Sequence, residues 1–346
     1  MRDTQLSWRT LYGYARAVSA FSKSVLPDLT RSSFERLASA GGAATPGAMQ
    51  AALPPHEAFA TSDNYPLAYR HYESRSTHRV VILVHGAGCF GDQLHALAQH
   101  LSQRDIADVY TLDMRGHGLS PGRPGHAVDE PRQMISDVAD FITFAARRHR
   151  GSSIVLGGHS AGGGLVLAIS RSPLHRLVTG YLFLAPFLGL GSPVNRPYFG
   201  GWVRLRGVRL RLLSLLSALG ITRFNGSTVV EFAPAARAID KRYIQSWSFN
   251  TTLAFGPGLW VEKKPPIGPD VPVLVLSGDN DECFHVSLYP AAFKIVAPHA
   301  EICSMGAIGH WDLLADPAML GAVERWLGRQ DMKPMGVPQV VKASTY

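Results

Sequence analysis

The stretch Gly158-His159-Ser160-Ala161-Gly162 decides the fold class of this 346-residue chain. It follows directly after a short apolar run at residues 154–156, and a helical pattern over residues 163–170 begins immediately after it. A serine between small residues in a strand–turn–helix context is typical of a nucleophile elbow, in which a tight, strained turn presents the hydroxyl above the end of a sheet. The alternative for Ser160 is an ordinary serine at a helix N-cap. We predict that Ser160 is a nucleophile.

Outward from this turn, short apolar runs alternate with helical patterns. A hairpin is expected at residues 56–61 and 67–72, on either side of Asp63-Asn64. The runs expected to be buried parallel strands are residues 80–84, 109–112, 154–156, 181–184 and 271–276, with a weaker candidate at 301–305. The helices expected between them are residues 92–103, 131–149 and 161–171. This alternation predicts an α/β fold with a mostly parallel central sheet flanked by helices.

A serine hydroxyl needs a base to remove its proton, and the base needs a carboxylate to orient it. In a fold with this elbow, the chain order is serine, then acid, then histidine. Asp279 and Asp281 both follow the fifth buried strand and compete for the role of the acid. His310, in a loop after the weaker strand candidate, is the predicted base. The nearest rivals for the base are His285 and His299.

The negative charge that develops on a substrate carbonyl needs two backbone N–H donors. One is expected from Ala161, the residue after the nucleophile, and the other from Ala87, in the loop after the first buried strand. Small residues in this loop let the backbone approach a substrate closely. The neighbouring residues predicted as candidates for the substrate pocket are His85, Gly86, Gly88 and His159. The loop is too short for a dinucleotide-binding fingerprint, so no NAD site is expected.

Four segments resemble one known group of enzymes. His85-Gly86 follows a strand, residues 113–120 read Asp-Met-Arg-Gly-His-Gly-Leu-Ser, residues 158–162 form the elbow, and Gly278 precedes Asp281 by three positions. The sequence is similar to α/β-hydrolases and, within them, to the monoacylglycerol lipase and lysophospholipase-like group, also called the serine aminopeptidase S33 type. The resemblance covers residues 56–328 approximately, and its Gly-x-x-Asp spacing favours Asp281 over Asp279. In that group the segment 113–120 is mainly structural, which implies no catalytic role for it here.

The resemblance implies an enzyme that cleaves carboxylic esters through an acyl-enzyme, with acylglycerol- or lysophospholipid-like substrates. Ser160, Asp281 and His310 would form the catalytic triad, and Ala87 and Ala161 the oxyanion hole. It implies no metal and no organic cofactor. The same triad also serves amidases or peptidases, thioesterases and acyltransferases, and the sequence does not separate these classes. A non-catalytic, membrane-associated binding protein is a further alternative, but it predicts erosion of the triad, and every triad residue is present.

The interval between residues 184 and 271 is too long for a simple crossover and predicts an insert. The resemblance implies a helical cap over the site at residues 187–266, between two parts of the core at 56–186 and 267–330. In the cap, several arginines stand among apolar residues at helical spacing. The apolar residues that share one helical face are Val208, Leu212, Leu215, Leu216 and Leu219. One interpretation is a helix packed over the pocket with solvated arginines. The other is a docking surface for lipid headgroups or an anionic substrate.

The first 55 residues differ from the rest of the chain. Apolar residues at helical spacing, with Arg9, Arg16 and Lys23 on the opposite face, predict an amphipathic helix followed by a linker. This helix either packs on the core with a solvated basic face or lies on an anionic membrane surface. Residues 331–346 are expected to form a C-terminal tail.

Composition narrows the remaining classes of protein. With 46% hydrophobic and 17% charged residues, the chain is not wholly disordered, and no apolar run is long enough for a membrane-spanning helix. No secretory signal is expected. The three cysteines, Cys89, Cys283 and Cys303, form no zinc motif, so a reducing, cytoplasmic environment is predicted, with peripheral membrane association as an addition. The net charge of +8 comes without nucleic-acid motifs, so no nucleic-acid partner is expected.

Overall fold

The computed structural model describes residues 53–75, 78–170, 172–234, 236–257, 267–330 and 332. The predicted amphipathic helix near the N-terminus and most of the predicted C-terminal tail lie outside the described residues. Among the helices that are described, none has the length and apolar character needed to cross a membrane.

The centre of the molecule is an eight-stranded sheet with the order β1-β2-β4-β3-β5-β6-β10-β11. Its strands are β1 (His56–Ala60), β2 (Pro66–Tyr72), β3 (Arg79–Val84), β4 (Asp108–Leu112), β5 (Ser153–His159), β6 (Gly180–Leu184), β10 (Val273–Ser277) and β11 (Glu301–Ser304). β1 and β2 pair antiparallel at one edge, and all strands from β4 onward in that order are parallel. Every residue of β4, β5, β6 and β10 is buried, which is why these strands are rich in apolar residues. The predicted mostly parallel sheet is confirmed.

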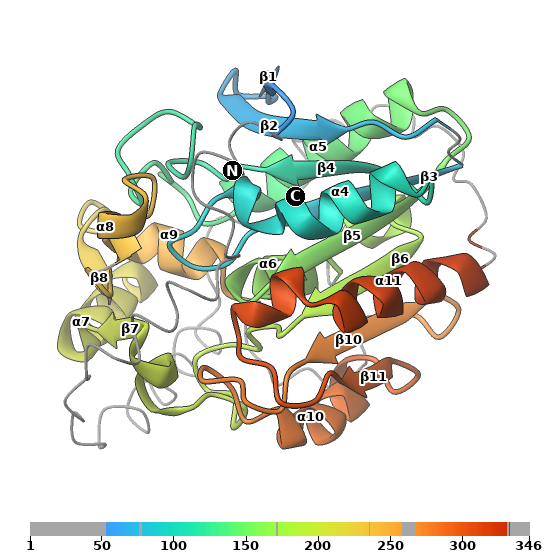
Figure 1. Ribbon diagram of the computed structural model, residues 1–346. Coiled ribbons are helices and arrows are strands. Elements are labelled where there is room, and N and C mark those ends of the chain that lie inside the picture. The colour runs from blue at the N-terminus through green and yellow to red at the C-terminus, as the bar shows by residue number, and fades with distance from the viewer. Residues whose placement is uncertain are drawn as a thin grey trace.

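Helices cover both faces of this sheet (Figure 1). The helices of the core are α4 (His95–Gln103), α5 (Gln133–Arg148), α6 (Ala161–Ser170), α10 (Tyr289–Val296) and α11 (Pro317–Arg329). α4 and α11 lie on one face, and α5 and α6 lie on the other. α11 shows how the sequence sets its own bounds: Asp316 accepts hydrogen bonds from two backbone N–H groups of its first turn, and Pro317 occupies the first helical position. Its apolar residues at helical spacing are the ones that are buried.

The insert between β6 and β10 contains strands as well as helices. Its elements are β7 (Val203–Leu205), α7 (Gly207–Ala218), β8 (Thr228–Phe232), α8 (Ala236–Ile239), β9 (Ser246–Ser248) and α9 (Phe249–Ala254). β7, β8 and β9 form a separate antiparallel sheet. The expectation of a helical cap missed this sheet, because strands of three to five residues are too short to show a period-two pattern.

Helix α7 lies at the outer end of the cap, away from the central sheet (Figure 1). The face buried against the rest of the cap carries Leu210, Leu213 and Ser214. The predicted apolar face points the other way: the exposed fractions are 82% for Val208 and 53% for Leu212. The interpretation that this face packs over the pocket is therefore wrong. The helix has apolar residues on two sides, and periodicity alone does not reveal which side meets the protein.

Candidate active site

Ser160 lies in a tight turn between β5 and α6, with a backbone φ of +52°, in the left-handed region that a residue with a side chain rarely occupies. The turn is held by two backbone hydrogen bonds, from Ser160 N to Leu184 O (3.0 Å) and from Phe187 N to Ser160 O (2.8 Å). The flanking glycines are required by space. A Cβ on Gly158 would lie 2.4 Å from the carbonyl carbon of Gly162, and a Cβ on Gly162 would lie 2.3 Å from Val84 O. The geometry is that of a nucleophile elbow.

The predicted base and acid are in direct contact. His310 Nδ1 donates a hydrogen bond to Asp281 Oδ2 over 2.8 Å, and the exposed fractions of the two side chains are 1% and 0%. The other carboxylate oxygen, Asp281 Oδ1, accepts backbone hydrogen bonds from Cys283 N and Phe284 N, both 2.8 Å long. Both oxygens of the acid are thus satisfied, so its orientation is fixed. The imidazole is held in the tautomer in which Nε2 carries no proton and can accept one.

The Asp281 carboxylate controls the charge state of the base. Burial is the largest single influence and lowers the pKa of His310, because a buried cation is poorly solvated, but the charge and hydrogen bond of Asp281 together with the effects of the neighbouring Cys283 more than offset it. The net result is a pKa of His310 well above the ordinary histidine value. Burial raises the pKa of the neighbouring Cys283 thiol, which therefore stays neutral beside the imidazole at pH 7.

The rival acid and bases lie elsewhere. Asp279 Oδ1 accepts a hydrogen bond from the Ser304 hydroxyl in an exposed position. The ring of His299 contacts Val271 O, also in an exposed position. His285 immediately precedes a short helical turn, and its backbone N–H donates to Val194 O over 2.7 Å. Of the candidates, only Asp281 and His310 meet.

The loop after β3 orients one of the two predicted oxyanion donors. Gly86 O accepts hydrogen bonds from His85 Nδ1 (2.8 Å) and from Cys89 N (3.3 Å). This carbonyl and the Ala87 N–H belong to the same peptide group, which is trans, so the two point in opposite directions. Anchoring the carbonyl thereby turns the Ala87 N–H away from these partners. Ala87, Ser160 and Ala161 all line one cavity.

His85 supports this loop from behind. Its side chain is fully buried, and Nε2 accepts a hydrogen bond from Met114 N over 3.2 Å while Nδ1 donates to Gly86 O. One donating and one accepting nitrogen define a neutral imidazole. Burial, followed by the proximity of His117, lowers the pKa of His85 well below the ordinary value, which agrees with this neutral form.

The four residues predicted as candidates for the substrate pocket are not among those that line the cavity. His159 is fully buried behind Ser160, with its ring 4.6 Å from that of His310 and its Nε2 3.3 Å from His310 O. A Cβ on Gly86 would approach His159 Nδ1 to 3.0 Å, and one on Gly88 would approach the Phe232 ring equally closely. Together with His85, these residues support the walls of the cavity and do not face its interior.

The cavity is built jointly by the core and the cap, and its lining is almost entirely apolar. Its floor carries Ser160, Ala87 and Ala161. The aromatic residues of its walls are Phe187, Phe199, Trp202, Phe232, Trp247, Phe255 and Phe284. An apolar chamber that ends at a serine is suited to bind hydrocarbon groups next to the hydroxyl.

Three further residues support the site. Glu282 Oε2 accepts a hydrogen bond from His310 N over 2.7 Å and so holds the loop of the base. Trp202, from the cap, donates its indole N–H to Ala87 O over 3.1 Å. Cys283 lines the cavity beside the Asp281–His310 pair. Glu282 and Cys283 directly follow Asp281, and this position in the sequence indicates a place near the site. The place of Trp202 depends on the folding of the cap and cannot be read from the sequence.

The segment 113–120 has a structural role, because its side chains form hydrogen bonds to neighbouring loops. Asp113 accepts hydrogen bonds from Gly91 N (2.6 Å) and Leu119 N (2.7 Å). A Cβ on Gly118 would lie 2.2 Å from the Asp113 carboxylate, which explains the glycine at this position. His117 Nε2 accepts from the indole N–H of Trp247 over 2.9 Å and so connects this segment to the cap.

Residues 75–304 match the family described as serine aminopeptidase, S33. This match covers more than half of the chain, and the chain belongs to that family. The fold is the α/β-hydrolase fold expected from the elbow.

Two curated relatives align with parts of the chain. The uncharacterized protein YnbC of Escherichia coli (strain K12) is 30% identical over 161 residues, which are 45% of this chain and 27% of YnbC. A monoacylglycerol lipase of Mycolicibacterium smegmatis is 36% identical over 89 residues, which are 26% of this chain and 31% of the lipase. The chain thus spans less than a third of the length of each of these relatives.

A similar solved structure is that of a soluble variant of monoglyceride lipase from Saccharomyces cerevisiae in complex with a substrate analogue. The TM-score is 0.63, with 17% sequence identity, and the superposition covers 82% of this chain and 98% of that chain. At this level of identity, the likeness concerns the fold.

Proposed function

We propose that this protein is a serine hydrolase that cleaves carboxylic esters through an acyl-enzyme. The observation that carries the proposal is the buried His310–Asp281 pair together with a strained Ser160 in the floor of an apolar cavity. These are the parts needed for nucleophilic acyl transfer, and they occur in the chain order of this fold.

Each residue has one role in the reaction. His310 Nε2 takes the proton of the Ser160 hydroxyl as its oxygen attacks the ester carbonyl, and the Ala87 and Ala161 N–H groups stabilise the resulting oxyanion. The protonated His310 then gives its proton to the leaving alcohol, and the acyl-enzyme forms. Water repeats the sequence with His310 as base and releases the carboxylic acid. Asp281 stabilises the imidazolium at both stages.

The lining of the cavity favours substrates with an acyl chain. The aromatic and aliphatic walls offer few hydrogen-bonding groups away from the floor, so a hydrocarbon chain is better accommodated than a charged peptide. One relative is named a monoacylglycerol lipase, in agreement with this choice. We therefore propose monoacyl esters of the acylglycerol or lysophospholipid type.

The test is a comparison of initial rates on p-nitrophenyl esters from acetyl to palmitoyl, on a monoacylglycerol and on a lysophospholipid. Wild type and Ser160→Ala are measured together. We expect Ser160-dependent rates that are highest on medium or long chains. Rates confined to acetyl and butyryl esters would contradict the lipid substrate, and absence of Ser160-dependent hydrolysis on every ester would contradict the esterase. Product analysis with added butanol shows whether an alcohol replaces water as acceptor, the mark of a transferase.

The exposed face of α7 supports a second part of the proposal, a peripheral contact with an anionic bilayer. The stretch 203–224 contains five arginines and no acidic residue. Beside them, apolar side chains lie open to solvent: Val208, Leu212, Leu215, Leu219, Ile221 and Phe224. Apolar groups that enter the headgroup region, flanked by cations that attract anionic lipid, are what an interfacial helix requires.

Liposome sedimentation tests this contact. We expect wild type to bind vesicles that contain anionic lipid more strongly than neutral vesicles, and the double variant Leu212→Ser, Leu215→Ser to bind less. Ile295→Ser is the matched control, since Ile295 is 46% exposed but lies on α10. Hydrolysis of a soluble ester shows that each variant is folded. Equal sedimentation of all three proteins would contradict docking through α7.

A further inference from the structure

Two histidines and an aspartate meet at the opposite end of the sheet from the candidate active site. His71 lies in β2, Asp108 begins β4, and His149 directly follows α5. The elbow follows the carboxyl end of β5, and β3 runs parallel to both β4 and β5. Asp108 is therefore separated from that end by the length of a five-residue strand, roughly 16 Å. The cluster is distinct from the triad.

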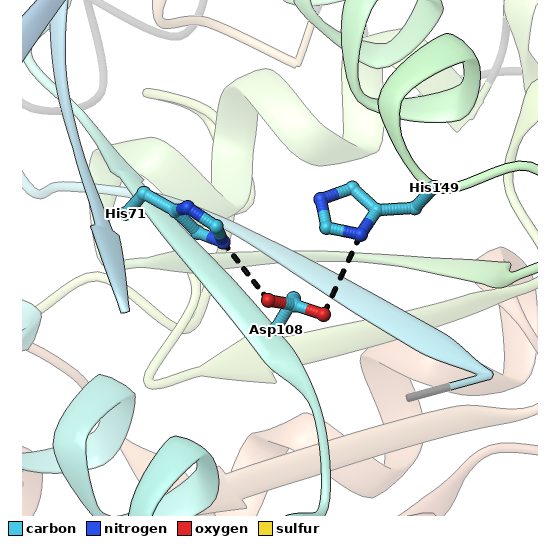
Figure 2. A group of neighbouring side chains, drawn as sticks. All are labelled: His71, Asp108 and His149. Carbon is cyan, nitrogen blue, oxygen red and sulfur yellow. Dashed lines mark hydrogen bonds and ion pairs between the residues drawn. The ribbon is translucent and has the colours of Figure 1, made fainter. Parts of the chain in front are cut away.

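The three side chains converge on one point (Figure 2). His71 Nε2 lies 2.9 Å from Asp108 Oδ1, and His149 Nδ1 lies 3.4 Å from Asp108 Oδ2. One nitrogen of each ring and a carboxylate oxygen all lie within 4.8 Å of one another. Figure 2 shows the two rings on either side of the carboxylate, each with a nitrogen turned toward it.

The cluster is held rigidly by its surroundings. The Tyr110 hydroxyl lies 2.7 Å from His149 Nε2, the nitrogen that faces away from Asp108. The Tyr110 ring stacks on His71, with a centroid distance of 4.3 Å and an interplanar angle of 5°. Asp108 Oδ1 also accepts a hydrogen bond from Ser74 N over 3.3 Å. A partner on the outer nitrogen of a histidine and a second contact on the carboxylate are what fix the ligands of a metal site.

We propose that His71, Asp108 and His149 bind one Zn²⁺ ion. In a tetrahedral zinc site with bonds of about 2.0–2.1 Å, neighbouring ligand atoms lie about 3.4 Å apart. Here His71 Nε2 is 2.9 Å from Asp108 Oδ1 and His149 Nδ1 is 3.4 Å from Asp108 Oδ2, so each nitrogen faces a different oxygen and the carboxylate would meet the ion with both. Two imidazoles and one carboxylate are a ligand set that zinc favours. The side chains of His71 and His149 are 7% and 14% exposed, so the cluster is in contact with solvent, from which a water molecule would supply the fourth ligand.

Binding requires each histidine to present a lone pair to the ion in place of an N–H group, and His71 to move slightly away from Asp108. His149 gives the lone pair of Nδ1 to the ion and carries its proton on Nε2, where the Tyr110 oxygen accepts it. His71 binds through Nε2 and carries its proton on Nδ1. The ion joins β2, the start of β4 and the residue after α5, segments that are far apart in the sequence. It therefore stabilises this edge of the sheet and takes no part in ester cleavage.

The experiment is equilibrium dialysis of the full-length, chelator-treated protein against low micromolar ZnCl₂, with thermal melts of the same samples. The variants are His71→Gln, His149→Gln and Tyr110→Phe. His100→Gln is the matched control, because His100 contacts a single carboxylate, that of Glu324 at 2.8 Å, which also pairs with Arg104 at 3.6 Å. His310→Gln is included because Asp281, Cys283 and His310 also lie within 4.8 Å of one another.

We expect one zinc ion per wild-type chain, retained in His100→Gln and His310→Gln and lost in His71→Gln and His149→Gln. Tyr110→Phe should bind about 10–100-fold more weakly. At a hundredfold excess over the dissociation constant, zinc should raise the melting temperature of wild type by roughly 5 °C and leave that of His149→Gln unchanged. Absence of saturable binding in wild type, equal binding in His71→Gln, or loss in His310→Gln alone would overturn the proposal.

Discussion

The two ends of the central sheet each hold a buried histidine–aspartate contact, and the contacts are almost identical in length. His310 and Asp281 are 2.8 Å apart, and His71 and Asp108 are 2.9 Å apart. Beyond the carboxyl ends of the strands, the pair stands beside a strained serine and an apolar cavity. At the other end, the carboxylate is shared by two imidazoles, and a tyrosine holds both rings. A short histidine–carboxylate contact thus has a chemical role that depends on its neighbours.

The largest expected loss of activity follows removal of the nucleophile, which only the active-site end of the sheet contains. Ser160→Ala should reduce kcat on a p-nitrophenyl ester by a factor of at least about 10⁴, because the elbow positions the hydroxyl of Ser160 to attack the ester and the alanine has no hydroxyl. Steady-state kinetics with a thermal melt of the same sample measures this. A folded Ser160→Ala protein with more than a tenth of the wild-type rate would show that the elbow is not the source of the activity.

The next effect compares three aspartates. Asp281→Asn should lower kcat by about 10³–10⁴-fold, because an amide cannot hold the imidazole in the required tautomer or stabilise its cation. Asp279→Asn, in an exposed loop, and Asp108→Asn, at the far end of the sheet, should each leave kcat within about twofold of wild type. If Asp279→Asn caused the larger loss, the assignment of the acid would be reversed.

The pH dependence of kcat/KM should show the effect of the Asp281 carboxylate on the pKa of His310. His310 must be neutral to act as base, and its raised pKa means that protonation begins while the pH is still above the ordinary histidine value of about 6.5. Activity should therefore fall with decreasing pH through a midpoint above 6.5. The residual activity of Asp281→Asn should have its midpoint at lower pH, since the negative charge is gone. A wild-type midpoint well below 6.5 would contradict this description of the pair.

The smallest effect is expected at the far end of the sheet. His149→Gln should change the rate of ester hydrolysis by no more than about twofold at 25 °C, although it removes a proposed zinc ligand. The measurement is kcat and KM of wild type and variant, both without added metal. A tenfold loss of kcat in folded protein would mean that the two ends of the sheet are coupled.

The difference between the two ends also explains what the sequence could predict. Ser160, Asp281 and His310 follow strand ends in a fixed chain order, so local patterns locate them and the structure brings the acid and base together. His71, Asp108 and His149 follow no such order, and only the antiparallel pairing of β2 with β4 brings the first two into contact. The sequence accordingly predicted no metal site.

The cap was the least predictable region, for a related reason. Its short strands give no clear period, and the two apolar sides of α7 look alike until the helix is packed. Helical spacing correctly grouped Val208, Leu212 and Leu215 on one face. It did not determine whether that face is buried, because burial depends on how the helix packs against other elements of the cap, such as β8.

The central claim is that Ser160 is an activated nucleophile, and covalent labelling tests it most directly. Folded wild type, Ser160→Ala and His310→Gln are incubated with a fluorophosphonate, and the intact mass of each is measured. We expect one adduct on wild type, on Ser160 by peptide mapping, none on Ser160→Ala, and labelling at least about 100-fold slower on His310→Gln. Folded wild type that takes no label, or Ser160→Ala that labels as fast as wild type, would contradict the account.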